Sequence, residues 1–147
     1  MSKIPNALRA GLMALAVLTA GGGGYVALER EQAAAAQAMA EQNQYIQAVA
    51  TDLGTSQAVK IAMVMGSYYE SSYRHIGTPY VDKLGKGQPL TVCNGITGRA
   101  VVAERYYSPA DCYALERSRY LAAERTAMGM FRLWTTYTPL QQAVFSD

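Results

Sequence analysis

The pattern of hydrophobic and polar positions opens with a long uncharged segment. No charged residue lies between Ala10 and Leu28, whereas Lys3 and Arg9 precede this segment. Its nineteen residues nearly suffice to cross a bilayer as a helix, which takes about 20. Eleven of them are Ala, Gly or Thr, and each of four consecutive glycines costs about 1 kcal/mol of helix propensity. The pattern therefore predicts a weak membrane helix within residues 1–28.

Three interpretations of residues 1–28 stay open: a cleaved signal peptide with small residues near Ala20, a permanent anchor, and an anchor that can leave the membrane. The weak hydrophobicity favours the third. Positive charge on the short N-terminal flank predicts that the rest of the chain faces the periplasm. We therefore expect residues 8–28 to hold the chain in the inner membrane until it is released into the periplasm.

Residues 29–52 form a second segment with a different pattern. They are rich in Ala, Gln and Glu, and large apolar residues are almost absent before Tyr45 and Val49. Such a segment has high helix propensity but cannot build a core. We interpret it as a helical spacer. The domain proper is placed at residues 53–147, because Leu53–Ser56 break the pattern and supply a helix N-cap.

The domain begins with a helical hydrophobic pattern that ends near Glu70. From Gly77 to Gly98, turn residues then alternate with short β-prone runs, which predicts a small antiparallel hairpin or three-stranded sheet. The helix carries apolar residues at the i, i+3, i+4 spacing of a core-facing surface, namely Ala58, Ile61, Ala62, Met65 and Tyr69.

Two later helices are indicated by their first residues. Ser108–Asp111 combines an N-cap hydroxyl, a proline at the first helical position and a carboxylate at the third, and Thr138–Gln141 has a similar start. The last helix is expected to pack through Leu140, Ala143 and Val144. It has no stop signal, so we expect the chain to be truncated. Together with the small sheet, these helices predict an α+β fold.

Composition and charge exclude several classes of function. The net charge of the 147 residues is +2, and the charges are interspersed, so no basic surface predicts nucleic-acid binding. His75 is the only histidine and no metal-ligand spacing is present, so we expect neither metal nor cofactor. We interpret His75 as a surface or hydrogen-bonding residue. Gly85–Gly87 is interpreted as a turn rather than a phosphate cradle, and Trp134 as a core residue.

The two cysteines bear on the compartment. An even number of cysteines in an exported chain favours a disulfide between Cys93 and Cys112, which would contribute about 3 kcal/mol by closing a loop. Two free buried thiols are the alternative.

Three side chains carry the candidate chemistry. Glu70 follows an apolar helix and has tyrosines on either side, Asp82 lies among turn residues, and Thr91 belongs to a β-prone run. Partial desolvation would favour the protonated form of Glu70, whereas a polar turn favours ionised Asp82. This division suits acid-catalysed glycoside cleavage. Singly, each residue also has an ordinary structural interpretation, as a solvated helix end, a turn former or a strand filler.

A larger motif surrounds these residues. A Tyr-x-Asp ends at Asp82, the block Thr91–Gly98 is Thr-Val-Cys-Asn-Gly-Ile-Thr-Gly, and an Asp-Cys pair ends at Cys112. From about Gln57 onward this pattern resembles the T4-type phage lysozymes of glycoside hydrolase family 24, especially the signal-arrest-release endolysins. The weak membrane segment matches that subgroup as well.

The resemblance implies a monomeric, lysozyme-like α+β fold with a small sheet lobe packed on helices. It implies a glycoside hydrolase that cleaves the β-1,4 bond between N-acetylmuramic acid and N-acetylglucosamine in peptidoglycan and lyses the host cell. The family's catalytic residues correspond to Glu70 as general acid, Asp82 as the residue that positions water or stabilises the transition state, and Thr91 as a holder of that water. Inversion at the anomeric carbon is also implied.

The chain departs from the family pattern at several points. The interval between Glu70 and Asp82 is longer, with an insertion around His75–Thr78, and Ser71 and Ile96 stand where the family commonly has Gly and His. The family continues into a second lobe, which we expect this chain to lack. Two other functions stay open: a non-catalytic, membrane-tethered peptidoglycan-binding remnant, and a lytic transglycosylase.

The weak anchor leads to the first prediction. Replacing Gly22 and Gly23 with leucine should trap the chain in the membrane, because leucine inserts favourably and supports the helix. Fractionation of expressing cells into membrane and soluble parts measures this retention. Unchanged release into the soluble fraction would contradict the prediction.

Overall fold

The computed structural model describes the backbone of residues 6–146 and the side chains of residues 25–146. Its contacts divide the chain into two compact units, Met1–Gln37 and Ala38–Asp147, and each is considered by itself. Most of the predicted anchor, residues 8–28, lies outside the described side chains. In the part of the chain that could be searched, no helix has the length and apolar character needed to cross a membrane.

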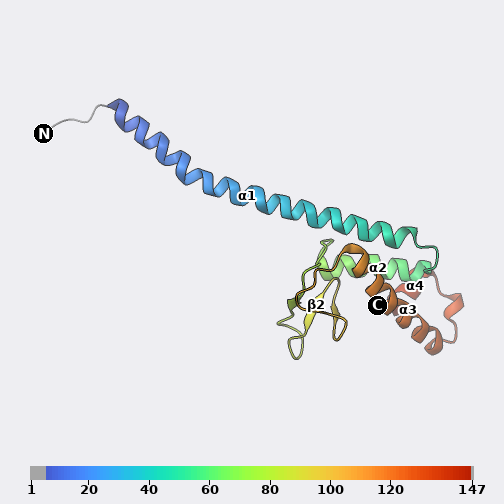
Figure 1. The fold of residues 1–147 in the computed structure, drawn as a ribbon. Helices are drawn as coiled ribbons and strands as arrows, with labels where there is room; N and C mark the ends of the chain where they lie inside the picture. Colours follow the sequence, from blue (N-terminus) through green and yellow to red (C-terminus); the bar gives the residue numbers. More distant parts are fainter. Residues whose placement is uncertain (1–5, 147) are drawn as a thin grey trace. The chain divides into compact units, whose positions relative to one another are not determined.

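One helix, α1 (Asn6–Thr51), runs through both units (Figure 1). Its side chains from residue 25 to residue 37 are exposed, whereas Gln42, Tyr45 and Val49 are buried in the second unit. The compact unit therefore starts at Ala38, earlier than the predicted boundary at residue 53. The buried residues recur every three or four positions and so share one helix face, but they are too few for their pattern to stand out in a polar, Ala-rich segment.

The second unit combines helices with a small sheet, so the predicted α+β class is confirmed. The three strands pair antiparallel in the order β1-β2-β3. Figure 1 shows the strands and their loops near the C-terminal end of α2. Helix α3 begins near the sheet and runs toward α4. The elements after α1 are α2 (Gln57–Ser71), β1 (Tyr80–Val81), β2 (Leu90–Val92), β3 (Ile96–Thr97), α3 (Pro109–Met130), the short 3-10 helix η1 (Trp134–Thr136) and α4 (Pro139–Ser146).

The predicted helix starts are confirmed. The Ser56 hydroxyl accepts a hydrogen bond from the Val59 amide at 3.1 Å and caps α2. Ser108 and Asp111 form a reciprocal capping box on α3. At α4, the Thr138 hydroxyl accepts from the Gln141 amide at 3.3 Å. These caps satisfy backbone amides that have no partner within their own helix.

The core faces of α2 and α4 differ from those expected. On α2, Ala58 and Ala62 of the predicted face are buried, but so are Val59 and Met63, and Tyr69 is 74% exposed, so the prediction was wrong for Tyr69. The helix contacts both α3 and α4, and its buried arc is therefore rotated from the expected one. On α4, Ala143 is buried but Leu140 and Val144 are exposed, because the helix approaches its neighbours through small residues.

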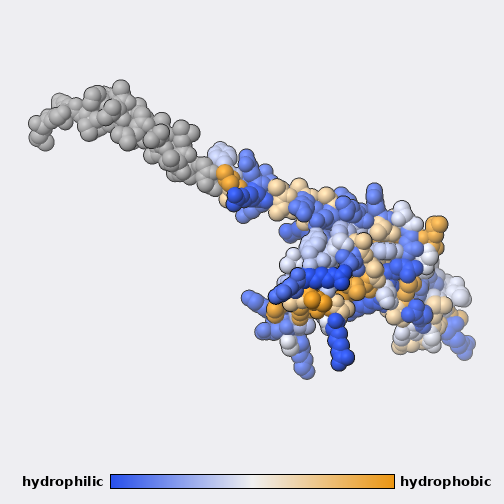
Figure 2. All heavy atoms as spheres, viewed as in Figure 1, coloured by the Kyte–Doolittle hydropathy of each residue, from blue (hydrophilic) through white to orange (hydrophobic). Residues whose placement is uncertain are grey.

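The hydrophobic core joins α1, α2, the sheet and the start of α3. Trp134 is also buried, beside Phe131 and Tyr137, which confirms its interpretation as a core residue. Figure 2 shows hydrophilic side chains over much of the visible face of this unit, with smaller hydrophobic areas between them. The core cluster consists of Tyr45, Val49, Val59, Met63, Val92, Cys93, Ile96, Tyr107 and Cys112.

Asp52 ties together the turn between α1 and α2 and the side of α3. Its carboxylate accepts hydrogen bonds from the Thr55 hydroxyl at 2.5 Å, the Gly54 amide at 2.7 Å and the Arg117 Nε at 2.6 Å, and also from the Tyr113 hydroxyl. The hydrogen bonds from Thr55, Tyr113 and Arg117 hold the pKa of Asp52 well below its ordinary range. The ionised form of Asp52 therefore stabilises this turn.

We predict that Asp52→Asn lowers the melting temperature at neutral pH. Because the folded-state pKa of Asp52 is depressed, its stabilisation is fully present above the unfolded pKa of about 4 and is lost as the pH falls further. The melting-temperature difference between wild type and variant should therefore shrink below about pH 4. Calorimetry across this range measures it, with the exposed Glu104→Gln as the control. A difference that stays constant on acidification would refute the role assigned to Asp52.

Candidate active site

A cavity of about 330 Å³ opens between the sheet, the end of α2, and helices α3 and α4. Glu70, Asp82 and Thr91, which come from three separate parts of the sequence, all line it. The cavity wall also includes Glu116 on α3 and Ser146 on α4. The three predicted catalytic residues are therefore brought to one cavity.

The sheet register brings Asp82 and Thr91 together. Tyr80 of β1 pairs with Thr91 of β2, and Asp82 is the first residue after β1. The carbonyl oxygen of Pro89 accepts a hydrogen bond from the Asp82 amide at 3.0 Å and from the Thr91 hydroxyl at 3.3 Å. This shared acceptor fixes the Asp82 backbone and the buried Thr91 hydroxyl relative to each other.

The Asp82 side chain is held by the turn that follows it. Its Oδ1 accepts a hydrogen bond from the Leu84 amide at 2.9 Å, which makes an Asx turn. Gly85 packs so closely that a Cβ atom there would lie 2.8 Å from Asp82 Oδ2. The structural interpretation of Asp82 as a turn former is thus correct, and it is compatible with chemistry because the same turn orients the carboxylate.

Glu70 occupies the last turn of α2. The helix ends because Ser72 and Tyr73 adopt left-handed backbone conformations with φ of 51° and 59°. The Ser72 amide then donates to the Tyr68 carbonyl at 3.0 Å. Glu70 is exposed, and so are the rings of Tyr68, Tyr69 and Tyr73, which pack edge to face on one another. The expected desolvation of Glu70 by these tyrosines is therefore wrong.

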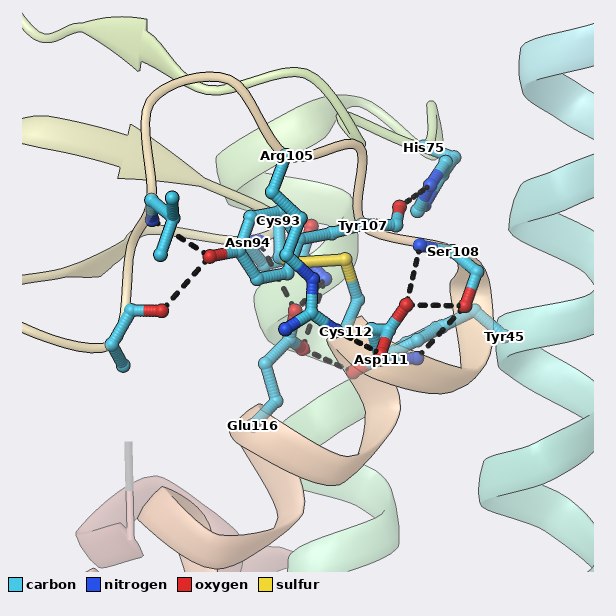
Figure 3. Close-up of a disulfide and its surroundings, with 12 residues drawn as sticks. Tyr45, His75, Cys93, Asn94, Arg105, Tyr107, Ser108, Asp111, Cys112 and Glu116 are labelled. Atoms are coloured by element: carbon cyan, nitrogen blue, oxygen red, sulfur yellow. Dashed lines mark hydrogen bonds and ion pairs between the residues drawn. A yellow bond between two sulfur atoms is a disulfide. The ribbon is translucent and has the colours of Figure 1, made fainter.

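The turn between β2 and β3 is held against α3 at three successive residues, and we call this the α3–turn contact. On α3 the contact uses Cys112, Glu116 and Arg119, which are spaced by four and three positions and therefore share one helix face. Figure 3 shows the disulfide of this contact beside a buried carboxylate. The pairs are Cys93 with Cys112 in the disulfide, Asn94 with Glu116 through hydrogen bonds, and Gly95 with Arg119, whose Nη1 donates to the Gly95 carbonyl at 3.0 Å.

Glu116 is the residue of this site that sequence reasoning missed. It is 1% exposed, and its carboxylate accepts hydrogen bonds from the Asn94 amide at 3.1 Å, from the Asn94 side chain at 3.0 and 3.1 Å, and from the Tyr45 hydroxyl. Burial raises the pKa of Glu116, and the hydrogen bonds from Tyr45 and Asn94 oppose that rise. The available signal was its position four residues after Cys112, on the same helix face.

The segment His75–Thr78 forms backbone contacts beside the site. The carbonyl of Ile76 accepts from the Cys93 amide at 2.8 Å, and that of Gly77 accepts from the Tyr107 amide at 2.8 Å. His75 donates through Nε2 to the Tyr107 carbonyl at 2.8 Å, which confirms its interpretation as a hydrogen-bonding residue. This segment thus supports the start of the β2–β3 turn.

One cluster in the described part of the chain has the composition of a metal site. The ligand atoms of Cys93, Cys112 and Glu116 lie within 4.8 Å of one another. Both sulfur atoms belong to the disulfide, however, and a metal-binding cysteine must supply a thiolate. This cluster is therefore a structural contact rather than a metal centre.

Comparison with known proteins gives no family for this chain. No protein-family model, curated protein or solved structure matches the chain.

The backbone of Gly95 provides a test of the turn. Its φ of 79° is left-handed, so Gly95→Ala should lower the free energy of unfolding by about 1–2 kcal/mol. Gly129→Ala is the matched control. This glycine lies inside α3 with open space around it, and alanine there should raise the free energy of unfolding by about 0.5–1 kcal/mol. Urea denaturation measures both, and effects of the same sign would contradict the description of the turn.

Proposed function

We propose that the chain is a muramidase that hydrolyses the β-1,4 bond between N-acetylmuramic acid and N-acetylglucosamine in bacterial peptidoglycan. One observation carries the proposal: Glu70, Asp82 and Thr91 line the same cavity. The resemblance of the motifs to T4-type phage lysozymes supports the choice of substrate. A pair of carboxylates that face one cavity is what most enzymes that cleave glycosidic bonds use.

The proposed mechanism assigns a separate task to each residue. Glu70, exposed at the end of α2, protonates the glycosidic oxygen as general acid. Asp82, oriented by the Leu84 amide, positions and activates the attacking water or stabilises positive charge at the anomeric carbon. Because the Thr91 hydroxyl donates a hydrogen bond to the Pro89 carbonyl, its oxygen can accept a hydrogen bond from that water. Water attack on the face opposite the leaving group would invert the anomeric carbon.

Two further features suit a glycan. Tyr80 lines the cavity and is partly exposed, so its ring offers an apolar face with a polar tip to a sugar. Arg119 lies on the cavity wall and provides a cation near the carboxylates. These features are ordinary in many proteins and add support only in combination with the three catalytic candidates.

The alternatives differ in what happens to the glycan. A non-catalytic peptidoglycan-binding protein would use the same cavity without breaking a bond. A lytic transglycosylase would use Glu70 alone and release a cyclised muramic acid. The shared anchoring of Asp82 and Thr91 at Pro89 favours hydrolysis, because both residues serve the handling of water.

Localisation belongs to the same proposal. A weak N-terminal anchor would hold the chain at the inner membrane with its second unit in the periplasm, where peptidoglycan lies. Release from the membrane would then give the enzyme access to the glycan strands. The Cys93–Cys112 disulfide is consistent with that oxidising compartment.

We predict that Glu70→Gln abolishes clearing of murein sacculi by the full chain, because glutamine has no acidic proton to give to the leaving oxygen. Turbidity and the release of reducing ends measure the effect. Glu104→Gln, the same change at an exposed position that is not among the cavity-lining residues, should leave both unchanged.

The result separates the alternatives. Wild-type protein that binds sacculi, leaves their turbidity unchanged and releases no reducing ends is a binding protein. Clearing without reducing ends indicates the transglycosylase, because its cyclised product has no reducing end. Undiminished clearing by Glu70→Gln would show that the acid has been wrongly assigned.

A further inference from the structure

Glu116 has no task in the mechanism above, although it lines the same cavity as Glu70, Asp82 and Thr91. At 1% exposure, and with hydrogen bonds to Tyr45 and Asn94 on its oxygens, it is poorly placed to give a proton to a glycan. A buried carboxylate is nevertheless expensive to desolvate. Apolar residues of similar size stabilise a core as well as or better than buried charges do. A purely stabilising role therefore explains this residue poorly.

The hydrogen bonds of Glu116 lead toward the proposed acid. Glu116 Oε1 accepts from both the backbone amide and the side-chain amide of Asn94, so it fixes that residue at two points. The next residue, Gly95, lies against Glu70, since a Cβ atom at Gly95 would be 3.6 Å from Glu70 Oε2. Glu116 is thus connected to the surroundings of the Glu70 carboxylate through two consecutive residues, Asn94 and Gly95.

The disulfide alone does not fix this path. It restrains Cys93, but it does not restrain the backbone conformation of the next two residues, Asn94 and Gly95. Gly95 has a φ of 79°, and glycine takes up left-handed and right-handed conformations with similar ease. Glu116 restrains the residue before this flexible point, and Arg119 restrains the carbonyl after its Cα.

We propose that Glu116 is a positioning residue that seats the Asn94–Gly95 backbone against the general acid Glu70. This inference rests on the muramidase function proposed above. Its chemical basis is complementarity, because a carboxylate, which only accepts hydrogen bonds, faces the backbone and side-chain amide donors of one residue. Catalysis is sensitive to such seating, since a misplacement of about 1 Å can cost about 100-fold in rate.

The test exchanges the two side chains across the contact. Glu116→Gln should lower kcat by about tenfold to a hundredfold with little change in KM, because one amide nitrogen then faces another. Asn94→Asp should lower kcat in the same way, because the carboxylate at position 94 then faces the carboxylate of Glu116. The double variant Asn94→Asp with Glu116→Gln restores one carboxylate and one amide, and leaves the glutamine oxygen to accept from the backbone amide of residue 94. Most of the lost kcat should return.

Asp52→Asn serves as the control for stability. It weakens the fold at a site that does not line the cavity, so kcat at a temperature where the variant is folded should stay at the wild-type value. Rates are measured as reducing ends released from sacculi, alongside the melting temperature of each variant. A loss of kcat in Asp52→Asn equal to that in Glu116→Gln would show that destabilisation alone explains the effect.

Each outcome decides the matter. A wild-type chain that releases no reducing ends overturns the proposed function and, with it, this inference. An active wild type with unchanged kcat in Glu116→Gln overturns the positioning role alone. If Glu116→Gln is unfolded in the assay, the double variant decides: recovered folding and kcat support the proposal, and a double variant that is inactive or unfolded overturns it.

Discussion

The structure depends most on the contact between one face of α3 and the turn that joins β2 to β3. The turn has two left-handed residues, Cys93 with φ of 56° and Gly95 with φ of 79°. For cysteine this conformation costs about 1–2 kcal/mol, so the turn must be held by its surroundings. The α3–turn contact does this with three kinds of bond: a disulfide, hydrogen bonds to a buried carboxylate, and a hydrogen bond from a guanidinium group.

The candidate active site is arranged around this contact. Thr91 lies on β2, two residues before the turn, and the Pro89 carbonyl links it to Asp82, the first residue after β1. Glu70 comes from α2 and meets the turn at Gly95. Glu70, Asp82 and Thr91 are thus arranged around a turn that α3 holds in place. A small sheet of two- and three-residue strands would otherwise be too weak to orient catalytic groups.

Local features could be predicted from the sequence, and so could the disulfide between Cys93 and Cys112, but most other long-range contacts could not. Ser56 and Ser108 were predicted as caps because a cap depends only on the next three residues. Tyr69 was placed on the wrong face because its exposure depends on which helices pack against α2. Glu116 was missed because a charged residue in a helix is usually solvated, and its partners Asn94 and Tyr45 lie 22 and 71 residues away in sequence. The burial that singles out Glu116 exists only in the folded chain.

The central claim is that the cavity of Glu70, Asp82 and Thr91 cleaves a glycan with water. The most direct measurement is mass analysis of the fragments released when wild-type protein digests murein sacculi in water enriched in heavy oxygen. The account predicts reducing-end muramic acid that carries one heavy oxygen atom for each bond cleaved. Anhydro-muropeptides without the label, or no released fragments, would contradict it.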